Sequence, residues 1–413
     1  MKRLLARTLP LRALPLLALA GVLFFFAPAA HAQGSGPRLP NPGFRSIGLW
    51  DQTIPIRMDI AVWYPSSRLP REILLEGWSL RAAQNGAATP GKYPVILVSH
   101  TTAASRLASH DLAAALTRHG FLVIAPTHPT DNADDTSGIY HAALFADRPE
   151  HLLLALDAVE RSPIFRPIMD RSRIGVLGVG AGAATALQLA GARPDLSRIA
   201  LSCPDGSYEN PLCSRWAKSF HQRMRDEFAA LLASGPEKFI PVIQQKPEQL
   251  SGDANPDEPA HAPANAERPV PSGSVPDPAP DPGEMFGPPS PPKIQPVLAV
   301  GLLTPGLVEL FPDASLLALT TPVGILTAAN DTLYPSGNSL DRLQKLLPQR
   351  PASRMLQNAG HSDVQAPCPP VYLESFPALC GNQNPEADDF RTIRNEFFIR
   401  FFQKTLGYPR DSF

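Results

Sequence analysis

The stretch Arg173–Ala190 has the sequence RIGVLGVGAGAATALQLA, and its pattern decides the fold. An apolar run, Ile174–Leu177, leads into glycines at positions 178, 180 and 182, and a small-residue helical pattern follows directly. Short apolar runs bounded by glycine are typical of buried strands. Glycines at such a turn let the following helix cross close to the strand. We therefore expect a strand, a tight turn and a closely packed helix.

Two kinds of site are built on such a turn. In the Gly-x-Ser-x-Gly nucleophile elbow of α/β-hydrolases the central residue is the serine nucleophile, and here that residue is Gly180. Gly-x-Gly-x-Gly also occurs in dinucleotide-binding loops. Two observations argue against a dinucleotide site. The stretch lies late in the chain, after at least three expected strands, and the N-terminus is typical of exported proteins, which are unlikely to encounter NAD. We expect a degenerate elbow and no cofactor.

Short apolar runs alternate with helical patterns along most of the chain. Strand-like runs are found at Asp59–Tyr64, Val95–Val98, Phe121–Ala125, Ile174–Leu177, Val297–Leu303 and Val323–Leu326. Helical patterns are found at Ala108–His119, Pro149–Glu160, Ala183–Ala190 and Asp389–Thr405. Several of the strand-like runs are apolar on both faces, as in strands covered by helices on each side. The order predicts an α/β fold with a doubly wound, mostly parallel sheet and helices on both faces.

The N-terminus has the features of an export signal. Four basic residues without an acidic partner precede an apolar run, Ala13–Phe26, and the segment ends in Ala30-His31-Ala32. This pattern predicts a signal peptide over 1–32. The alternative is a membrane anchor, but the run is shorter than the roughly 20 residues that span a bilayer. We expect a periplasmic or secreted protein with no integral membrane segment in the mature chain.

The charge balance excludes a nucleic-acid-binding protein. The chain has 37 Lys+Arg and 38 Asp+Glu, and removal of residues 1–32, with four basic residues, leaves 33 against 38, or −5. A protein that binds the phosphate backbone normally carries an excess of positive charge.

The four cysteines are all in the mature part, which predicts disulfides in an oxidising compartment. Three pairings are possible, and the two local ones are favoured: Cys203 with Cys213, and Cys368 with Cys380. Zinc is the rival interpretation, but no Cys-x-x-Cys spacing occurs, and no metal site is expected.

Two insertions interrupt the alternation of strands and helices. Within 215–234, Trp216, Phe220, Met224 and Phe228 recur at helical spacing. This segment is either a helix packed on the body or a cap over a pocket. The stretch 247–292 has 14 prolines in 46 residues, and we expect an exposed, disordered or polyproline-like loop. The loop is either an inert insertion or a docking site for a protein partner.

The chain resembles the predicted dienelactone hydrolase and platelet-activating-factor acetylhydrolase-like branch of the α/β-hydrolase superfamily. The resemblance begins at Ile60–Pro65 (IAVWYP) and runs to the final helix, without the Pro-rich insertion. Its marks, in order, are Pro94–Arg106 (PVILVSHTTAASR), Val123–Asp131 (VIAPTHPTD), Arg148-Pro149, Leu156–Ala158, Thr185–Leu187, Ala329–Pro335 (ANDTLYP) and Ala359–His361 (AGH). We therefore expect a first hydrolase part over 33–246, which contains the cap candidate at 215–234, then the Pro-rich insertion over 247–293 and a second hydrolase part over 294–413.

The resemblance also implies the site residues. Asp331 and His361 match the acid and the base, since the aspartate fixes the imidazole tautomer and the imidazole takes the proton of the nucleophile. The backbone N–H groups of Ala181 and Thr102 match the oxyanion donors. Thr101 stands where relatives carry glycine, a second departure in the same site. Without the resemblance, the residues leave two interpretations open. Asp331 could be the acid or a turn residue, and His361 could be the base or a loop histidine.

Other residues near these motifs have weaker claims. Asp363 is a second candidate for the acid. His110, His119, His128 and His141 are expected to be structural or surface residues.

Gly180 has no side chain that could attack a carbonyl, so the acyl-enzyme route is closed at this position. We expect an impaired hydrolase that binds a small ester-like ligand or a partner and turns over little. One alternative is an active carboxylic ester hydrolase that uses Ser99, Ser105 or a water activated by His361. Another is an envelope interaction protein that uses the Pro-rich loop.

Overall fold

The computed structural model of the 413-residue chain describes residues 39–51, 56–139, 141–202, 222, 226–230, 233, 296–375, 380 and 384–408. The expected signal peptide, the Pro-rich insertion, Cys203 and Cys213 lie outside the described residues, as does most of the expected cap helix. Residues 226–230 of that helix are helical.

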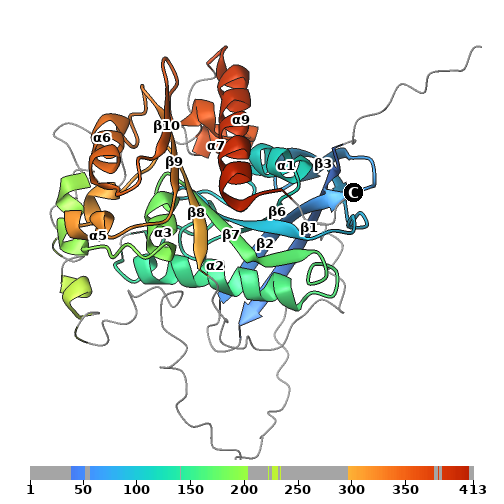
Figure 1. The fold of residues 1–413 in the computed structure, drawn as a ribbon, viewed down its shortest axis with the longest axis horizontal. Helices are drawn as coiled ribbons and strands as arrows, with labels where there is room; N and C mark the ends of the chain where they lie inside the picture. The colour runs from blue at the N-terminus through green and yellow to red at the C-terminus, as the bar shows by residue number, and fades with distance from the viewer. Residues whose placement is uncertain are drawn as a thin grey trace, which may run out of the picture. The chain divides into compact units, whose positions relative to one another are not determined.

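Ten strands form one sheet in the order β10-β9-β8-β7-β5-β6-β2-β1-β4-β3 (Figure 1). The strands are β1 (Asn41–Asp51), β2 (Ile56–Ser66), β3 (Arg71–Leu75), β4 (Trp78–Gln84), β5 (Tyr93–Ser99), β6 (Leu122–Pro126), β7 (Met169–Val179), β8 (Val297–Leu303), β9 (Val323–Ala328) and β10 (Ala352–Leu356). From β10 to β6 all neighbours are parallel. β2 is antiparallel to β6 and β1, and β3 is antiparallel to β4. The mostly parallel sheet is confirmed, and each expected strand is present.

Helices cover both faces of the sheet. Residues of α1 (His110–Arg118) and α9 (Ala387–Leu406) share one buried cluster, and residues of α2 (Leu144–Arg161), α3 (Gly182–Leu189), α5 (Asp313–Leu317) and α6 (Ser336–Leu346) share the other (Figure 1). Side chains of β5 alternate between the clusters, Val95 and Leu97 in one and Ile96 and Val98 in the other, because successive strand residues face opposite sides. The doubly wound arrangement is therefore confirmed.

Shorter helical elements lie in the connections. They are the helix α7 (Pro370–Ser375) and the 3-10 turns η1 (Leu196–Ser202), η7 (Val308–Leu310) and η8 (Ser362–Val364). None of the helices in the described part of the chain is both long and apolar enough to span a bilayer.

Helix α2 corrects the expected start at Pro149. It begins at Leu144, so the proline lies inside the helix. Proline is favoured in the first turn because it lacks an N–H, and here it cannot donate to the carbonyl of Phe145. Leu144 and Phe145 are both buried in the core. Burial of these two side chains offsets the hydrogen bond that the proline removes. The expected start at Pro149 took only the preference of proline for the first turn into account.

The Cys368–Cys380 disulfide is present, with a Cα–Cα distance of 5.6 Å. It confirms one of the two favoured local pairings and crosslinks the region that follows η8.

A buried arginine ties α9 to the rest of the domain. Arg394 is fully buried; its guanidinium donates to the carbonyl of Val364 in η8 at 2.7 Å and to Oδ2 of Asp111 in α1 at 2.6 Å. Burial, the largest single cause, raises the pKa of Asp111. The charges of Arg394 and His110 and the hydrogen bonds from Arg394 and Leu112 together outweigh burial, so the net pKa is lowered. The charge pair thus connects two helices and the turn that follows His361.

We predict that Asp111→Asn lowers the free energy of unfolding by about 2–3 kcal/mol, because it leaves the Arg394 charge buried without its carboxylate. Urea denaturation measures the change. The control is Glu396→Gln, which removes the exposed partner of Arg400 and costs about 0.5 kcal/mol or less. Equal losses in the two variants would contradict the role of the buried pair.

Candidate active site

The turn between β7 and α3 is so tight that it leaves no room for a β-carbon at Gly178 or Gly182. A β-carbon on Gly178 would lie 2.3 Å from the carbonyl oxygen of Gly182, and one on Gly182 would lie 2.2 Å from the carbonyl oxygen of Ser99. Gly180, between them, has a φ of +53°, in the left-handed region. The end of β7, the start of α3 and the end of β5 are therefore in direct backbone contact.

The space beside Gly180 is filled. A β-carbon on Gly180 would lie 2.1 Å from Thr101 Oγ1 and 2.8 Å from Cε2 of Tyr334. A β-carbon on Gly306 would lie 2.3 Å from Cδ1 of the same tyrosine, so the ring lies against both glycines. Position 180 thus lacks the hydroxyl and also lacks the room for a side chain.

The structure brings Asp331 and His361 together. Asp331 follows β9 and His361 follows β10, and His361 Nδ1 lies 2.9 Å from Asp331 Oδ2. Asp331 Oδ1 also accepts the backbone N–H of Tyr334 at 2.8 Å. The carboxylate favours the tautomer with hydrogen on Nδ1, which leaves Nε2 as the basic nitrogen. Nε2 is buried and has no hydrogen-bond partner among the described residues.

Asp363, the second candidate for the acid, has other partners. Its Oδ2 accepts the backbone N–H of Gly360 at 2.7 Å and the side-chain amide of Asn384 at 3.3 Å. The imidazole of His361 is therefore paired with Asp331.

Tyr334 lies at the meeting point of the expected site residues. Its ring contacts Gly180, and the ring centroid is 5.5 Å from that of His361. Its hydroxyl is 3.2 Å from Thr102 Oγ1. Burial raises the pKa of Tyr334 to about 12, against the lowering effect of the Thr102 and Thr101 hydroxyls, so the phenol is neutral at physiological pH.

The residues of the two expected oxyanion donors line the same small cavity. Thr102 and Ala181 line a space of about 20 Å³ together with Arg148 and several apolar side chains. Among the described residues neither backbone N–H has a hydrogen-bond acceptor. A space of this size holds about one water molecule. It is too small for an ester substrate.

The loop after β5 has its unusual backbone angle at Ala103. The φ of Ala103 is +54°, and Thr101 is not among the residues with positive φ. The N–H of Ala103 donates to Asp131 Oδ1 at 2.8 Å. The threonine in place of glycine therefore fits the loop without backbone strain, and its side chain is directed at Gly180.

Sequence reasoning missed the polar network behind this loop. Arg148 donates to Asp131 Oδ2 at 3.0 Å and to the carbonyl of His100, and His128 lies between His100 and His151. The signal available in the sequence was position: His100 and His128 follow β5 and β6, which are neighbours, so their carboxyl ends meet at one edge of the sheet. No group of His, Cys, Asp or Glu side chains suited to a metal ion occurs within the described ranges.

The remaining histidines have other surroundings. His110 packs on Trp78, His119 contacts the carbonyl of Ala115, and His141 pairs with Glu227.

The two alternative serines have partners of their own. Ser99 Oγ lies 2.9 Å from His128 Nε2, and Ser105 Oγ accepts the N–H of Leu107 at 3.2 Å. Neither makes a contact with His361, so the described geometry does not favour either as a nucleophile.

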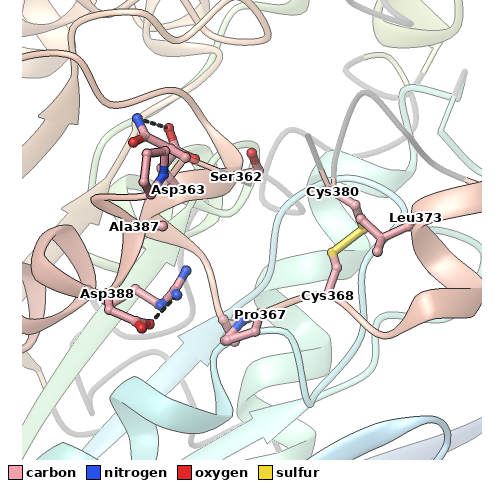
Figure 2. A pocket seen from close by; sticks show the side chains of 12 residues that line it. Ser362, Asp363, Pro367, Cys368, Leu373, Cys380, Ala387 and Asp388 are labelled. Atoms are coloured by element: carbon pink, nitrogen blue, oxygen red, sulfur yellow. Dashed lines mark hydrogen bonds and ion pairs between the residues drawn. A yellow bond between two sulfur atoms is a disulfide. The ribbon is translucent and has the colours of Figure 1, made fainter. Parts of the chain in front are cut away.

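A larger cavity, of about 320 Å³, lies against η8 and the disulfide (Figure 2). Ser362, Asp363 and the Cys368–Cys380 pair are among its lining residues, but His361 is not. The cavity is therefore separate from the space that the imidazole faces.

The sheet order, the two helical layers and the elbow-like turn define an α/β-hydrolase fold. No family model and no curated protein matches the sequence. Among solved structures, the chain is similar to a ferulic acid esterase from Streptomyces cinnamoneus, with a TM-score of 0.51 and 17% sequence identity over 89% of this chain and 91% of the esterase. At this identity the likeness establishes the fold alone.

We predict that Gly180→Ser lowers the free energy of unfolding by about 1–3 kcal/mol, because its β-carbon collides with the Thr101 hydroxyl and the Tyr334 ring. Chemical denaturation measures the loss. Addition of Thr101→Gly should recover part of it. Gly48→Ser is the matched control, since a β-carbon there lies 3.7 Å from its nearest neighbour. A Gly180→Ser variant as stable as the parent would refute the steric argument.

Proposed function

We propose that this chain is an exported α/β-hydrolase-fold protein of the dienelactone hydrolase-like branch, that its ester hydrolysis is impaired, and that it acts by binding a ligand or partner. The ordered motifs from Ile60 to His361 support the branch. The basic and apolar N-terminal segment, 1–32, supports export.

One observation carries the proposal: Thr101 Oγ1 lies 2.1 Å from the place of a β-carbon on Gly180. In an active serine hydrolase of this fold, the elbow places the nucleophilic hydroxyl next to the base and the oxyanion donors. Loss of a triad nucleophile costs on the order of 10⁶ in rate in well-studied serine hydrolases. Here the Thr101 and Tyr334 side chains also occupy the space that a serine side chain would need, so the packing itself excludes a nucleophile at this position.

The groups that remain are suited to a carbonyl compound. Asp331 and His361 keep the geometry of an acid and a base, and Ala181 and Thr102 line one small cavity. A small ester-like ligand is the class that such donors would hold, and the Tyr334 ring would have to move to admit it. Docking of a protein partner through 247–293 remains a prediction.

We predict that the purified mature chain does not hydrolyse p-nitrophenyl acetate or butyrate at ordinary esterase rates, and that His361→Asn leaves the residual rate unchanged. Release of p-nitrophenol measures both. Rapid hydrolysis that is lost in His361→Asn would defeat the proposal.

The same assay can test whether a restored hydroxyl at position 180 brings back activity. The triple variant Thr101→Gly, Gly180→Ser, Tyr334→Val clears the space and supplies the hydroxyl. It should gain roughly two orders of magnitude in rate, dependent on His361, which is well short of a complete triad's contribution. If this variant folds and stays inactive, the assignment of Gly180 as the former nucleophile position fails.

A second candidate function rests on the same contact. The Thr101 hydroxyl lies where the elbow hydroxyl is missing, is buried, and makes no well-formed hydrogen bond among the described residues, although it lowers the pKa of Tyr334. In this candidate, Thr101 Oγ1 attacks the ester carbonyl and His361 Nε2 takes its proton. The alcohol leaves with that proton, and water then hydrolyses the acyl-threonine.

We predict, for the second candidate, that a fluorophosphonate probe labels the wild-type chain at Thr101 and that Thr101→Ser keeps the label. The isosteric Thr101→Val should lose it, and Thr102→Val, which keeps its backbone N–H, is the matched control. Peptide mass spectrometry locates the adduct. An unlabelled wild-type chain would exclude this candidate and leave the first intact.

A further inference from the structure

Three buried histidines lie behind the loop that fills the site. His100 follows β5, His128 follows β6 and His151 lies in α2; we term them the histidine cluster. Each is at most 9% exposed, and the ring centroids are 4.7 Å apart for His100 and His128 and 5.6 Å apart for His128 and His151. The cluster contacts neither Asp331 nor His361 among the described interactions, so the proposed function does not use it.

Hydrogen bonds hold His100 in one neutral tautomer. The backbone N–H of His128 donates to His100 Nε2 at 2.9 Å, so this nitrogen carries no hydrogen. The hydrogen is then on Nδ1, which donates to the carbonyl of Thr101 at 2.7 Å. Protonation would place a second hydrogen on Nε2, directly opposite the His128 N–H. The charged form of His100 therefore requires that this hydrogen bond break.

The other two histidines share one contact. His128 Nδ1 and His151 Nδ1 are 3.4 Å apart, a distance that accommodates a single hydrogen between them. His128 Nε2 lies 2.9 Å from Ser99 Oγ. If both histidines were charged, a hydrogen on each Nδ1 would face the other. At most one of the pair can be charged while this contact persists.

The charges around the cluster oppose further protonation. The charge of Arg148, in α2, acts on all three rings, and Asp131, after β6, is already bound to Arg148 and to the N–H of Ala103. Tyr334, after β9, faces Arg148 and is neutral. Asp131 is thus not free to pair with an imidazolium.

Burial and then Arg148 lower the pKa values of all three histidines. The pKa values of His100 and His151 are about 3, and the pKa of His128 is well below its usual value.

The cluster and Arg148 hold the backbone that closes the site. The carbonyl of Thr101 is bound by His100, the carbonyl of His100 by Arg148, and the N–H of Ala103 by Asp131. The same segment places Thr101 Oγ1 against Gly180. If these bonds break, the segment that fills the nucleophile space is no longer fixed.

We propose that the histidine cluster is an acid-sensitive latch: proton uptake by His100, His128 and His151 releases the segment Ser99–Ala103 from Gly180 and opens the site. The proposal rests on the contacts of this segment and holds whether or not the site turns over substrate.

The direction of the pH effect follows from linkage. A histidine exposed by opening has a pKa of about 6.5, well above its value in the closed form, so the open form binds more protons. The stabilisation of the closed form is complete above about pH 6.5 and is lost as the pH falls toward about 3. Each histidine that takes up a proton on opening raises the opening equilibrium constant by up to about ten-fold per pH unit in this window.

Hydrogen exchange of the full mature chain tests the latch. Opening constants of peptides that cover 99–106 are measured from about pH 7 to about pH 5 and corrected for the intrinsic exchange rate. We expect a rise steeper than about ten-fold per pH unit, since more than one histidine takes up a proton. Peptides of α9, which makes no hydrogen bond or ring contact with the cluster among the described residues, serve as the internal reference. An opening constant at 99–106 that is independent of pH would overturn the proposal.

A single variant separates the cluster from general acid sensitivity. His151→Gln can still hydrogen-bond to His128 but cannot be charged. One proton fewer is then taken up on opening, so the opening constant should rise about ten-fold less per pH unit than in the wild type. His119→Gln, at the end of α1 and outside the cluster, is the matched control and should leave the slope unchanged. Equal slopes in the two variants would contradict the latch.

If His151→Gln does not fold, imidazole nitrogen NMR of the wild-type chain decides. The latch requires that the three imidazoles of the closed form stay neutral at about pH 5, with the hydrogen of His100 on Nδ1. Titration of all three near their usual pKa while 99–106 stays protected would overturn it.

Discussion

The position of the Thr101 hydroxyl, in the space that a β-carbon on Gly180 would need, is the constraint on which the state of this site depends. It is possible only because Gly180 has no β-carbon and because the loop after β5 directs the threonine at the elbow. The Tyr334 ring closes the same space from the side of β9. Positions 101, 180 and 334 share one tightly packed volume. A larger side chain at any of them would therefore force the other two to move.

Asp331 and His361 remain paired beside an elbow that has no nucleophile, and the packing supplies a physical reason. Asp331 accepts hydrogen bonds from both His361 and the Tyr334 backbone, and both side chains are buried. Removal of one partner would leave a buried polar or charged group unsatisfied. The turn after His361 is also fixed by Arg394. The pair therefore contributes to the fold apart from any role in catalysis.

The loop between β5 and α1 depends on groups that lie behind it. Arg148 neutralises Asp131 and binds the carbonyl of His100, while the histidine cluster stays uncharged. A buried network of this kind is stable only when each donor has an acceptor and the net charge is small. The conformation of the loop, and with it the position of Thr101, therefore depends on the protonation state of residues outside the elbow.

The sequence by itself determined the α/β alternation, the strand–glycine–helix turn and the absence of a hydroxyl at position 180, because these follow from local periodicity and residue type. It also indicated Asp331 and His361, through a resemblance rather than through spacing. Only the tertiary structure decided that Thr101 and Tyr334 fill the vacated space and that three histidines gather behind the loop. These residues are far apart in the chain, and their contacts depend on which strands are neighbours in the sheet. Strand order is a long-range property that local pattern does not encode.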